Sequence, residues 1–198
     1  MWYYQEITLH PTADVPESFM MAKIYGKLHL ALSDSRDTEG KIHCGVSFPE
    51  YSLNPKTLGK KIRVLSQNKD ALKGLSLDSV FSLLIKRRYI HLTPIRAVPI
   101  QLVKHYAVYR RLGLANARCK ARRFAKRHAV SVDEAESFFP REKNDELPYV
   151  WFNSHSTGQN FGLIIQKQLV EGKECHPEDM SLDFSSYGLS GHQFVPEF

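Results

Sequence analysis

The first hundred residues alternate between short segments with strand character and longer segments with helical periodicity. Strands are expected where aromatic and β-branched residues cluster between turn-forming residues, at positions 2–9, 43–48, 61–65 and 89–98. Helices are expected where apolar residues recur every three or four positions, at 16–32 and 70–86, the second with a break or shift at Gly74. The order β-α-β-β-α-β predicts a ferredoxin-like (RRM-like) domain over residues 1–100, a fold that indicates no function by itself.

The second half, residues 101–198, is expected to form an α+β domain packed on the first, since no linker rich in Gly or Ser separates them. Its expected strands are at 103–110, 149–152 and 161–167, and its expected helices at 114–128 and 131–138. The sequence SVDE fits a capping box that begins the second helix, which ends before Pro140. Gly158 is the expected turn residue between the last two strands, and the aromatic C-terminal segment is expected to dock on the fold.

The composition narrows the class of protein. With 198 residues, 42% of them hydrophobic and 11% aromatic, the chain can build a real core and is not of the disordered class. The three cysteines, Cys44, Cys119 and Cys175, have neither zinc-type spacing nor the pattern of a disulfide framework, which favours a reducing compartment. There is no signal-peptide pattern and no apolar run of membrane-spanning length, so we expect a soluble, cytoplasmic protein.

The positive charge of the chain is concentrated in one segment. Residues 79–132 contain thirteen Lys or Arg and no Asp or Glu, whereas the whole chain has 27 basic and 21 acidic residues. The rest of the chain is therefore acidic on balance, and the formal net charge of +6 comes from this segment alone. Such an asymmetry indicates a polyanionic partner.

The predicted helix at 114–128 carries most of this charge. Arg118, Arg122 and Lys126 would form one row at a spacing of four residues, with Arg123 and Arg127 on the next row. Like charges at this spacing repel, so a helix without neighbouring acids is best explained by an external anion. A solvated helix face is the alternative, but solvated faces usually mix charges of both signs. Nucleic acid is the favoured partner, through contacts to phosphates.

Three of the nine histidines are candidates for chemistry on such a partner: His29 at a helix end, His155 in the expected turn and His128 in the basic helix. RNA carries its own nucleophile, the 2′-hydroxyl beside each phosphate. An enzyme that cuts there needs a base for that hydroxyl and stabilisation of charge on the phosphate, and no metal is required. Imidazole titrates in the right range for the base. Taken alone, each histidine is more often a structural or surface residue than a catalytic one.

Four motifs occur in one order along the whole chain: YGKLHLAL at 25–32, GVSFPE at 45–50, SHSTGQNF at 154–161 and SSYGLS at 185–190 followed by QFVP. The basic RRFAKRH lies between the second and third. In this combination the chain resembles the CRISPR-associated endoribonucleases of subtype I-F, which cut precursor CRISPR RNA at its repeat hairpin.

This resemblance implies a ferredoxin-like N-terminal domain, a C-terminal domain whose arginine-rich helix enters the major groove of the repeat stem-loop, and metal-independent cleavage 3′ of the stem without a cofactor. His29 matches the family's catalytic histidine, Ser154 the serine that holds the ribose, and Tyr187 the tyrosine that orients the histidine. The implied products are a 2′,3′-cyclic phosphate and a 5′-hydroxyl. The implied partners are the CRISPR repeat RNA and other subunits of a surveillance complex.

The resemblance and the charge pattern together predict the RNA-binding residues. Phe161 matches the aromatic that stacks under the terminal base pair of the stem. Ser156 and Thr157 fall where the family contacts the RNA next to the cut. The predicted set is Arg110, Arg111, Arg118, Arg122, Arg123, Lys126, Arg127, His128, Ser156, Thr157 and Phe161. Three positions depart from the family pattern: Leu112 stands where a glutamine reads a purine, Lys126 stands for arginine, and Asn153 for a basic residue.

Other interpretations of the same residues stay open at this point. Phe161 and Tyr187 could be core aromatics, and Ser154 a turn hydroxyl bonded to its own backbone. The protein could be a non-catalytic RNA-hairpin-binding subunit of a ribonucleoprotein complex, in which His29 is structural. A DNA-binding protein is a third class, which would bind duplex DNA and be indifferent to the 2′-hydroxyl.

Overall fold

A computed structural model describes residues 1–10, 15–112, 117–138, 146–153, 160–170 and 182–198. It has α-helices and two main antiparallel sheets, so the predicted α+β class is confirmed. Most of the buried side chains, from Trp2 to Val195, form one hydrophobic cluster that includes residues of both halves of the chain. In the described ranges, no helix is both long enough and apolar enough to cross a membrane.

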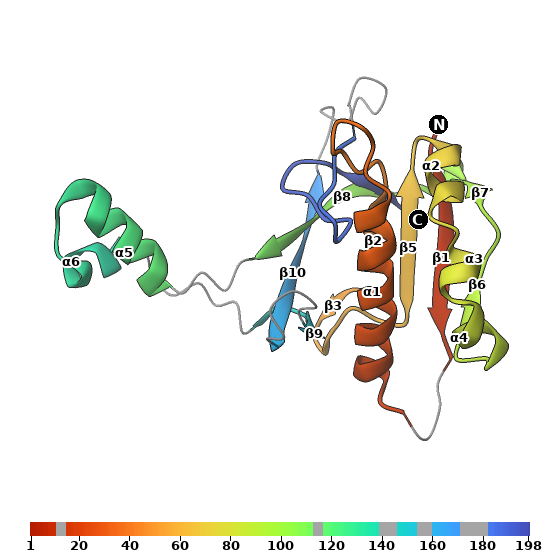
Figure 1. Cartoon of the computed structure of the whole chain (residues 1–198), viewed down its shortest axis with the longest axis horizontal. Helices are drawn as coiled ribbons and strands as arrows, with labels where there is room; N and C mark the ends of the chain where they lie inside the picture. Colours follow the sequence, from red (N-terminus) through yellow and green to blue (C-terminus); the bar gives the residue numbers. More distant parts are fainter. Residues whose placement is uncertain (11–14, 113–116, 139–145, 154–159, 171–181) are drawn as a thin grey trace.

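The first sheet has the order β2-β5-β1-β6, with β7 also paired to β1. Its strands are β1 (Tyr3–Leu9), β2 (Gly45–Ser47), β5 (Lys61–Ser66), β6 (Ile90–Leu92) and β7 (Arg96–Ala97), and all described pairs are antiparallel. Helix α1 (Glu17–Asp34) connects β1 to β2, and α2 (Lys69–Gly74), α3 (Leu77–Val80) and α4 (Ser82–Lys86) connect β5 to β6. Helices α1 and α3 lie side by side (Figure 1).

The buried face of α1 follows from its helical periodicity. Met21, Ile24, Leu28 and Leu32 recur every three or four residues and are buried. On β1 the buried positions alternate, as expected for a strand with one face against the helices. The apolar pattern of the sequence thus fixes which side of each element faces the core, and it leaves His29 at the border of the buried stripe of α1.

The second sheet has the order β11-β8-β10-β9. Its strands are β8 (His105–Leu112), β9 (Tyr149–Asn153), β10 (Asn160–Val170) and β11 (Val195–Glu197). The C-terminal strand β11 pairs antiparallel with β8, which confirms that the C-terminus docks on the fold. A small hairpin of β3 (Ser52–Leu53) and β4 (Lys56–Thr57) was not expected, because two-residue strands are too short to have a periodicity.

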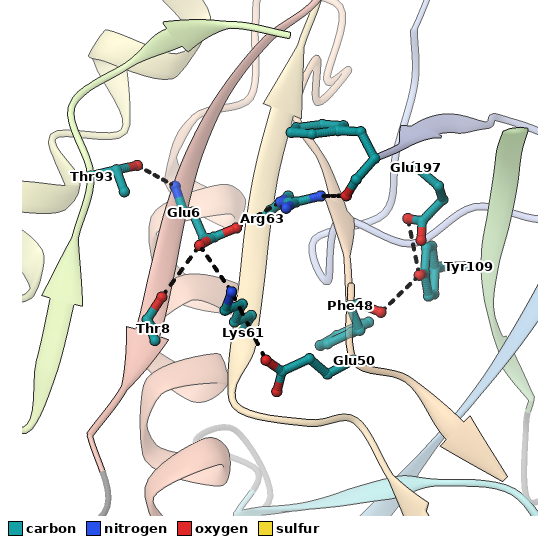
Figure 2. Close-up of polar contacts among 10 residues, drawn as sticks. Glu6, Thr8, Phe48, Glu50, Lys61, Arg63, Thr93, Tyr109 and Glu197 are labelled. Carbon is teal, nitrogen blue, oxygen red and sulfur yellow. Dashed lines mark hydrogen bonds and ion pairs between the residues drawn. The ribbon is translucent and has the colours of Figure 1, made fainter. Parts of the chain in front are cut away.

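Polar contacts join the C-terminal strand to the first sheet (Figure 2). Glu6 accepts a hydrogen bond of 2.7 Å from Arg63 Nε, and the same guanidinium donates to the main-chain oxygen of Phe198. The Tyr109 hydroxyl lies 3.1 Å from both the Phe48 carbonyl and the Glu197 carboxylate. Burial, together with Glu197, raises the pKa of Tyr109, so this hydroxyl keeps its proton. These bonds fix β8 and β11 relative to β2 and β5.

Two expected elements are interrupted in the structure. The helix expected at 70–86 is three short helices, because the chain turns after Gly74 and Ser76 takes a left-handed conformation with φ 47°. The strand expected at 89–98 is divided into β6 and β7 by residues 93–95, where Pro94 has no N–H to donate to a ladder. Strand β8 begins and ends two residues later than expected, and β2 is shorter than the expected 43–48.

Helix α5 (Ala117–His128) lies within the expected range 114–128, of which residues 114–116 are outside the described part of the chain. It packs on α6 (Val132–Glu136) through the buried Ala121, Ala125 and Ala135. Ser131 caps α6 by accepting a hydrogen bond of 3.1 Å from the N–H of Glu134, as the SVDE sequence predicted. The two helices lie apart from both sheets (Figure 1).

Candidate active site and basic helix

His29 is held by the backbone of a segment that is far away in the sequence. Its Nδ1 lies 2.8 Å from the carbonyl oxygen of Ser186. Since a carbonyl oxygen can only accept, Nδ1 must carry the proton, and this assigns the tautomer. In the neutral imidazole, Nε2 then keeps its lone pair. The His29 side chain as a whole is partly exposed.

Tyr25 makes a second bond to the same segment, one helical turn before His29. Its hydroxyl donates a hydrogen bond of 2.7 Å to the carbonyl oxygen of Tyr187. Tyr25 is fully buried, and burial, with a smaller effect of Tyr187, raises its pKa well above the usual value. The hydroxyl therefore stays protonated as a donor. Two side chains on one face of α1 thus contact two consecutive carbonyls, which fixes the helix against residues 186–187.

The segment that offers these carbonyls is a tight turn at residues 185–190. The N–H of Gly188 donates to Ser185 O at 2.8 Å, and the N–H of Val46 donates to Gly188 O at 2.9 Å. Gly188 has φ +68°, and a Cβ added there would lie 2.3 Å from Val46 Cγ2. Only glycine fits both the conformation and the space. The YGLS motif is therefore explained by the turn that presents Ser186 and Tyr187 to His29.

Aromatic rings surround the imidazole. The ring of Tyr187 stacks on His29 with centroids 4.1 Å apart and an interplanar angle of 7°. Phe152 contacts Tyr187 edge to face at 5.6 Å and lies 5.8 Å from Phe161, its neighbour across β9 and β10. Tyr187 and Phe161 pack against the core but stay partly exposed. These two rings are therefore packed against the core and can also take part in a site at the surface.

Arg110 and Arg111 point to opposite faces of the second sheet. The guanidinium carbon of Arg111 lies 5.3 Å from the ring centroid of Tyr187 and 5.4 Å from that of Phe161. Arg110 instead donates from Nε to Gln166 Oε1 at 2.6 Å, across the β8–β10 pair. The structure thus brings Arg111 together with Phe161 and with Tyr187, the ring that stacks on His29, and it separates Arg110 from them.

Helix α5 forms a second region, apart from α1, the helix to which His29 belongs (Figure 1). Ala121 and Ala125 pack against α6, and the basic side chains of α5 that the structure describes are exposed: Arg122, Arg123, Lys126, Arg127 and His128. The ring of His128 stacks on Phe124 at 4.2 Å. None of these five pairs with a carboxylate in the described part of the chain. The side chain of Arg118 lies outside the described residues.

Several predicted site residues also lie outside the described residues: Ser154, His155, Ser156 and Thr157. The flanking strand ends are described, with Asn153 opposite Asn160 in the antiparallel register. The chain therefore leaves and re-enters the second sheet directly beside the Phe152–Phe161 pair. No described His, Cys, Asp or Glu belongs to a group of three that could hold a metal ion. The metal independence of cleavage stays a prediction.

Known proteins are similar to this chain over its whole length. The family model described as CRISPR-associated protein (Cas_Csy4) matches residues 4–198. The chain belongs to the Csy4 family of CRISPR-associated proteins. A relative from Pseudomonas aeruginosa (strain UCBPP-PA14), named CRISPR-associated endonuclease Cas6/Csy4, is 30% identical over 204 residues, covering 100% of both chains. A second with the same name, from Escherichia coli (strain UTI89 / UPEC), is 28% identical over 201 residues, again covering both chains fully.

Membership of the Csy4 family confirms the resemblance found in the motifs, which spans both the α1 segment and the C-terminal turn. The structure adds contacts of this Csy4-family chain that the motifs did not predict. Tyr25 and Gln166 touch predicted site residues through pairings across 162 and 56 residues of sequence. Tyr25 does stand inside the YGKLH motif, four residues before His29, which was the one available signal. Nothing in the sequence pointed to Gln166.

Proposed function

We propose that the protein is an endoribonuclease that binds the stem-loop of the CRISPR repeat and cleaves precursor CRISPR RNA on the 3′ side of the stem. The observation that carries the proposal is the imidazole of His29, fixed by Ser186 O in the tautomer whose Nε2 lone pair can accept a proton. The names of the two relatives, both CRISPR-associated endonucleases, support the same class of reaction.

The proposed reaction is an attack of the 2′-hydroxyl on the adjacent phosphate. His29 Nε2 accepts the hydroxyl proton, the 2′-oxygen forms a bond to phosphorus, and the bond from phosphorus to the 5′-oxygen breaks. The leaving oxygen takes up a proton, from the imidazolium or from water, so the reaction has no net proton change. Its products are a 2′,3′-cyclic phosphate and a 5′-hydroxyl. Positioned proton transfer of this kind contributes about 10²- to 10⁴-fold to the rate.

Two further residues act at this centre in the proposal. Ser154 holds the ribose that carries the attacking hydroxyl. Tyr187 orients His29 by stacking on the face of its ring at 4.1 Å, while the carbonyl oxygen of Ser186 accepts a hydrogen bond from Nδ1 at the edge of the same ring. A rotation of the imidazole would cost both contacts, which supports a preorganised base.

Recognition of the hairpin is assigned to three groups of residues. Phe161 stacks under the terminal base pair of the stem and so sets the distance to the cut. The cations of α5 enter the major groove near the end of the short stem, where the groove is open. Ser156 and Thr157 contact the RNA beside the cut. Because the stem and its contacts survive cleavage, the protein remains bound to the product hairpin and joins other subunits of a surveillance complex.

The proposed architecture is a ferredoxin-like domain at residues 1–100 that carries His29 and an RNA-hairpin-binding domain at 101–198. The antiparallel order β2-β5-β1-β6, with helices inserted after β1 and β5, supports the first assignment. Because the parent RNA is made inside the cell, a cytoplasmic location belongs to the same proposal.

The test is cleavage of a cognate repeat hairpin in EDTA, with a matched RNA that has a deoxyribose before the scissile phosphate. We expect cleavage of the first RNA only, with a cyclic phosphate on the upstream fragment. Tight binding without cleavage would instead identify a non-catalytic hairpin-binding subunit. Equal binding of duplex DNA with the stem sequence would indicate a DNA-binding protein.

A further inference from the structure

Arg111 is a cation that the fold places against Tyr187, the ring that stacks on His29, without giving it a described partner of opposite charge. It lies on β8 opposite Ile165, and its side chain is on the same face of the sheet as Phe161. The guanidinium is exposed, and no carboxylate of the described residues pairs with it. Its neighbours are instead the faces of two aromatic rings, which hold the head group in place without neutralising it.

Arg111 and His29 have the ring of Tyr187 as a common neighbour. Both groups contact the ring of Tyr187, the imidazole at 4.1 Å and the guanidinium carbon at 5.3 Å. An RNA that contacts both groups makes one hydrogen bond of about 2.8 Å from its 2′-hydroxyl to Nε2 and one of similar length from the guanidinium to a phosphate oxygen. The span between the two side chains is these two bonds plus the width of the phosphate. Because both distances are measured to the same ring centroid, the imidazole and the guanidinium are close enough for one nucleotide to contact both.

The proposed reaction needs a cation at this point. When the 2′-oxygen adds to phosphorus, a second negative charge develops on the non-bridging oxygens. A guanidinium can donate two parallel N–H bonds to those oxygens and stays charged at any working pH. None of the other residues assigned to the cut carries a permanent positive charge: His29, Tyr187, Ser154 and Phe161 do not.

We propose that Arg111 is a catalytic residue that donates to the non-bridging oxygens of the scissile phosphate and stabilises the charge that develops there. The inference rests on the endoribonuclease function proposed above. It assigns different tasks to two adjacent arginines, because Arg110 faces away from Tyr187 and is engaged by Gln166.

The experiment compares Arg111→Gln and Arg111→Lys with the control Arg96→Gln, at an exposed arginine of β7 to which no role at the site is assigned. Rates are measured under single turnover with enzyme in saturating excess, and hairpin affinity is measured separately with the uncleavable 2′-deoxy RNA. Removing one preorganised donor to a developing oxyanion costs about 10²- to 10³-fold. We expect a rate loss of about 10²-fold for Arg111→Gln, a smaller loss for Arg111→Lys, and no significant loss for Arg96→Gln.

A sulfur substitution at each non-bridging oxygen of the scissile phosphate supplies the readout that a structural role would not change. If Arg111 contacts one of these oxygens, sulfur at that oxygen slows cleavage by the wild-type protein. The same sulfur slows cleavage by Arg111→Gln to a smaller extent. An unchanged sulfur effect, or a loss of affinity at an unchanged saturated rate, would overturn the assignment to the phosphate. If the wild type does not cleave at all, the proposed function itself fails; if wild type and Arg111→Gln cleave equally, only this inference does.

Discussion

The surroundings of His29 and those of helix α5 differ in how they are built. His29 is fixed by elements from three distant parts of the chain: α1, the turn at 185–190 and the β9–β10 pair. Helix α5 is fixed by its immediate neighbour α6, through a cluster of three buried alanines. The first region has its groups within contact distance of the core, whereas the second exposes its cations to solvent.

This difference corresponds to what each proposed task requires. Proton transfer at a 2′-hydroxyl depends on angstrom-level placement of a base, which a packed core can supply. Phosphate contacts depend mainly on the number of cations that can reach the RNA, so a helix that packs only on a neighbouring helix can supply them. Changes in the first region should therefore alter the rate, and changes in the second should alter affinity and its salt dependence.

The largest expected effect comes from replacing His29 by alanine, compared with the same replacement of the histidine in the second region. His29→Ala removes the proposed base, so the single-turnover rate at saturation should fall by about 10²- to 10⁴-fold with little change in hairpin affinity. His128→Ala, in α5, is the matched control and should leave that rate unchanged. Equal losses in both variants would contradict the division of tasks and would move the base away from α1.

Gly188→Ala should damage the first region through its backbone. The left-handed φ of +68° and the 2.3 Å approach to Val46 together should lower the free energy of unfolding by about 3 kcal/mol. The variant should also cleave more slowly at saturation, since Ser186 and Tyr187 move with the turn. Denaturant unfolding measures the first effect. Gly191→Ala is the control, because an added Cβ there meets nothing within 4 Å, and it should change the stability little.

Arg122→Ala combined with Arg123→Ala should affect the second region only. Each lost phosphate contact should reduce the slope of log affinity against log salt by about one, and hairpin affinity at low salt should fall by about 10- to 100-fold. The saturated cleavage rate should stay close to that of the wild type. Binding titrations at several salt concentrations test this. An unchanged slope would remove α5 from the interface, and a large rate loss at saturation would show that α5 also shapes the active site.

The two regions also differ in how far the sequence could predict them. The basic helix is a local feature, so its charge, its range and the Ser131 cap that follows it were accessible from consecutive residues. The site around His29 depends on contacts between residues 157 or more positions apart, which no local pattern encodes. There the motifs named His29, Tyr187 and Phe161 but not the bonds that hold them.

Arg110 and Arg111 mark the limit of sequence interpretation most clearly. As neighbours in the chain they looked like one RNA-binding pair, and only the alternation of side chains along a defined strand separates them. The strand itself was expected to end at residue 110, so the sequence offered no face for Arg111. The strand expected at 89–98 was also misjudged from its neighbours. The apolar residues on both sides of Pro94 predicted one continuous strand, although the proline divides it.

Tyr25→Phe is the finest test of the comparison, since it removes one oxygen atom from the support of His29. The carbonyl of Tyr187 would lose its buried donor, and we expect the free energy of unfolding to fall by about 1 kcal/mol. Tyr51→Phe is a matched control: it also removes a hydroxyl that donates to a backbone carbonyl, that of Ile165 at 3.1 Å, in a contact that does not involve His29. Both variants should lose similar stability, but only Tyr25→Phe should slow cleavage at saturation, by a few-fold, because its bond fixes α1 against the turn that presents Tyr187 and Ser186. A slower rate in both would mean that cleavage follows overall stability rather than the local support of the imidazole.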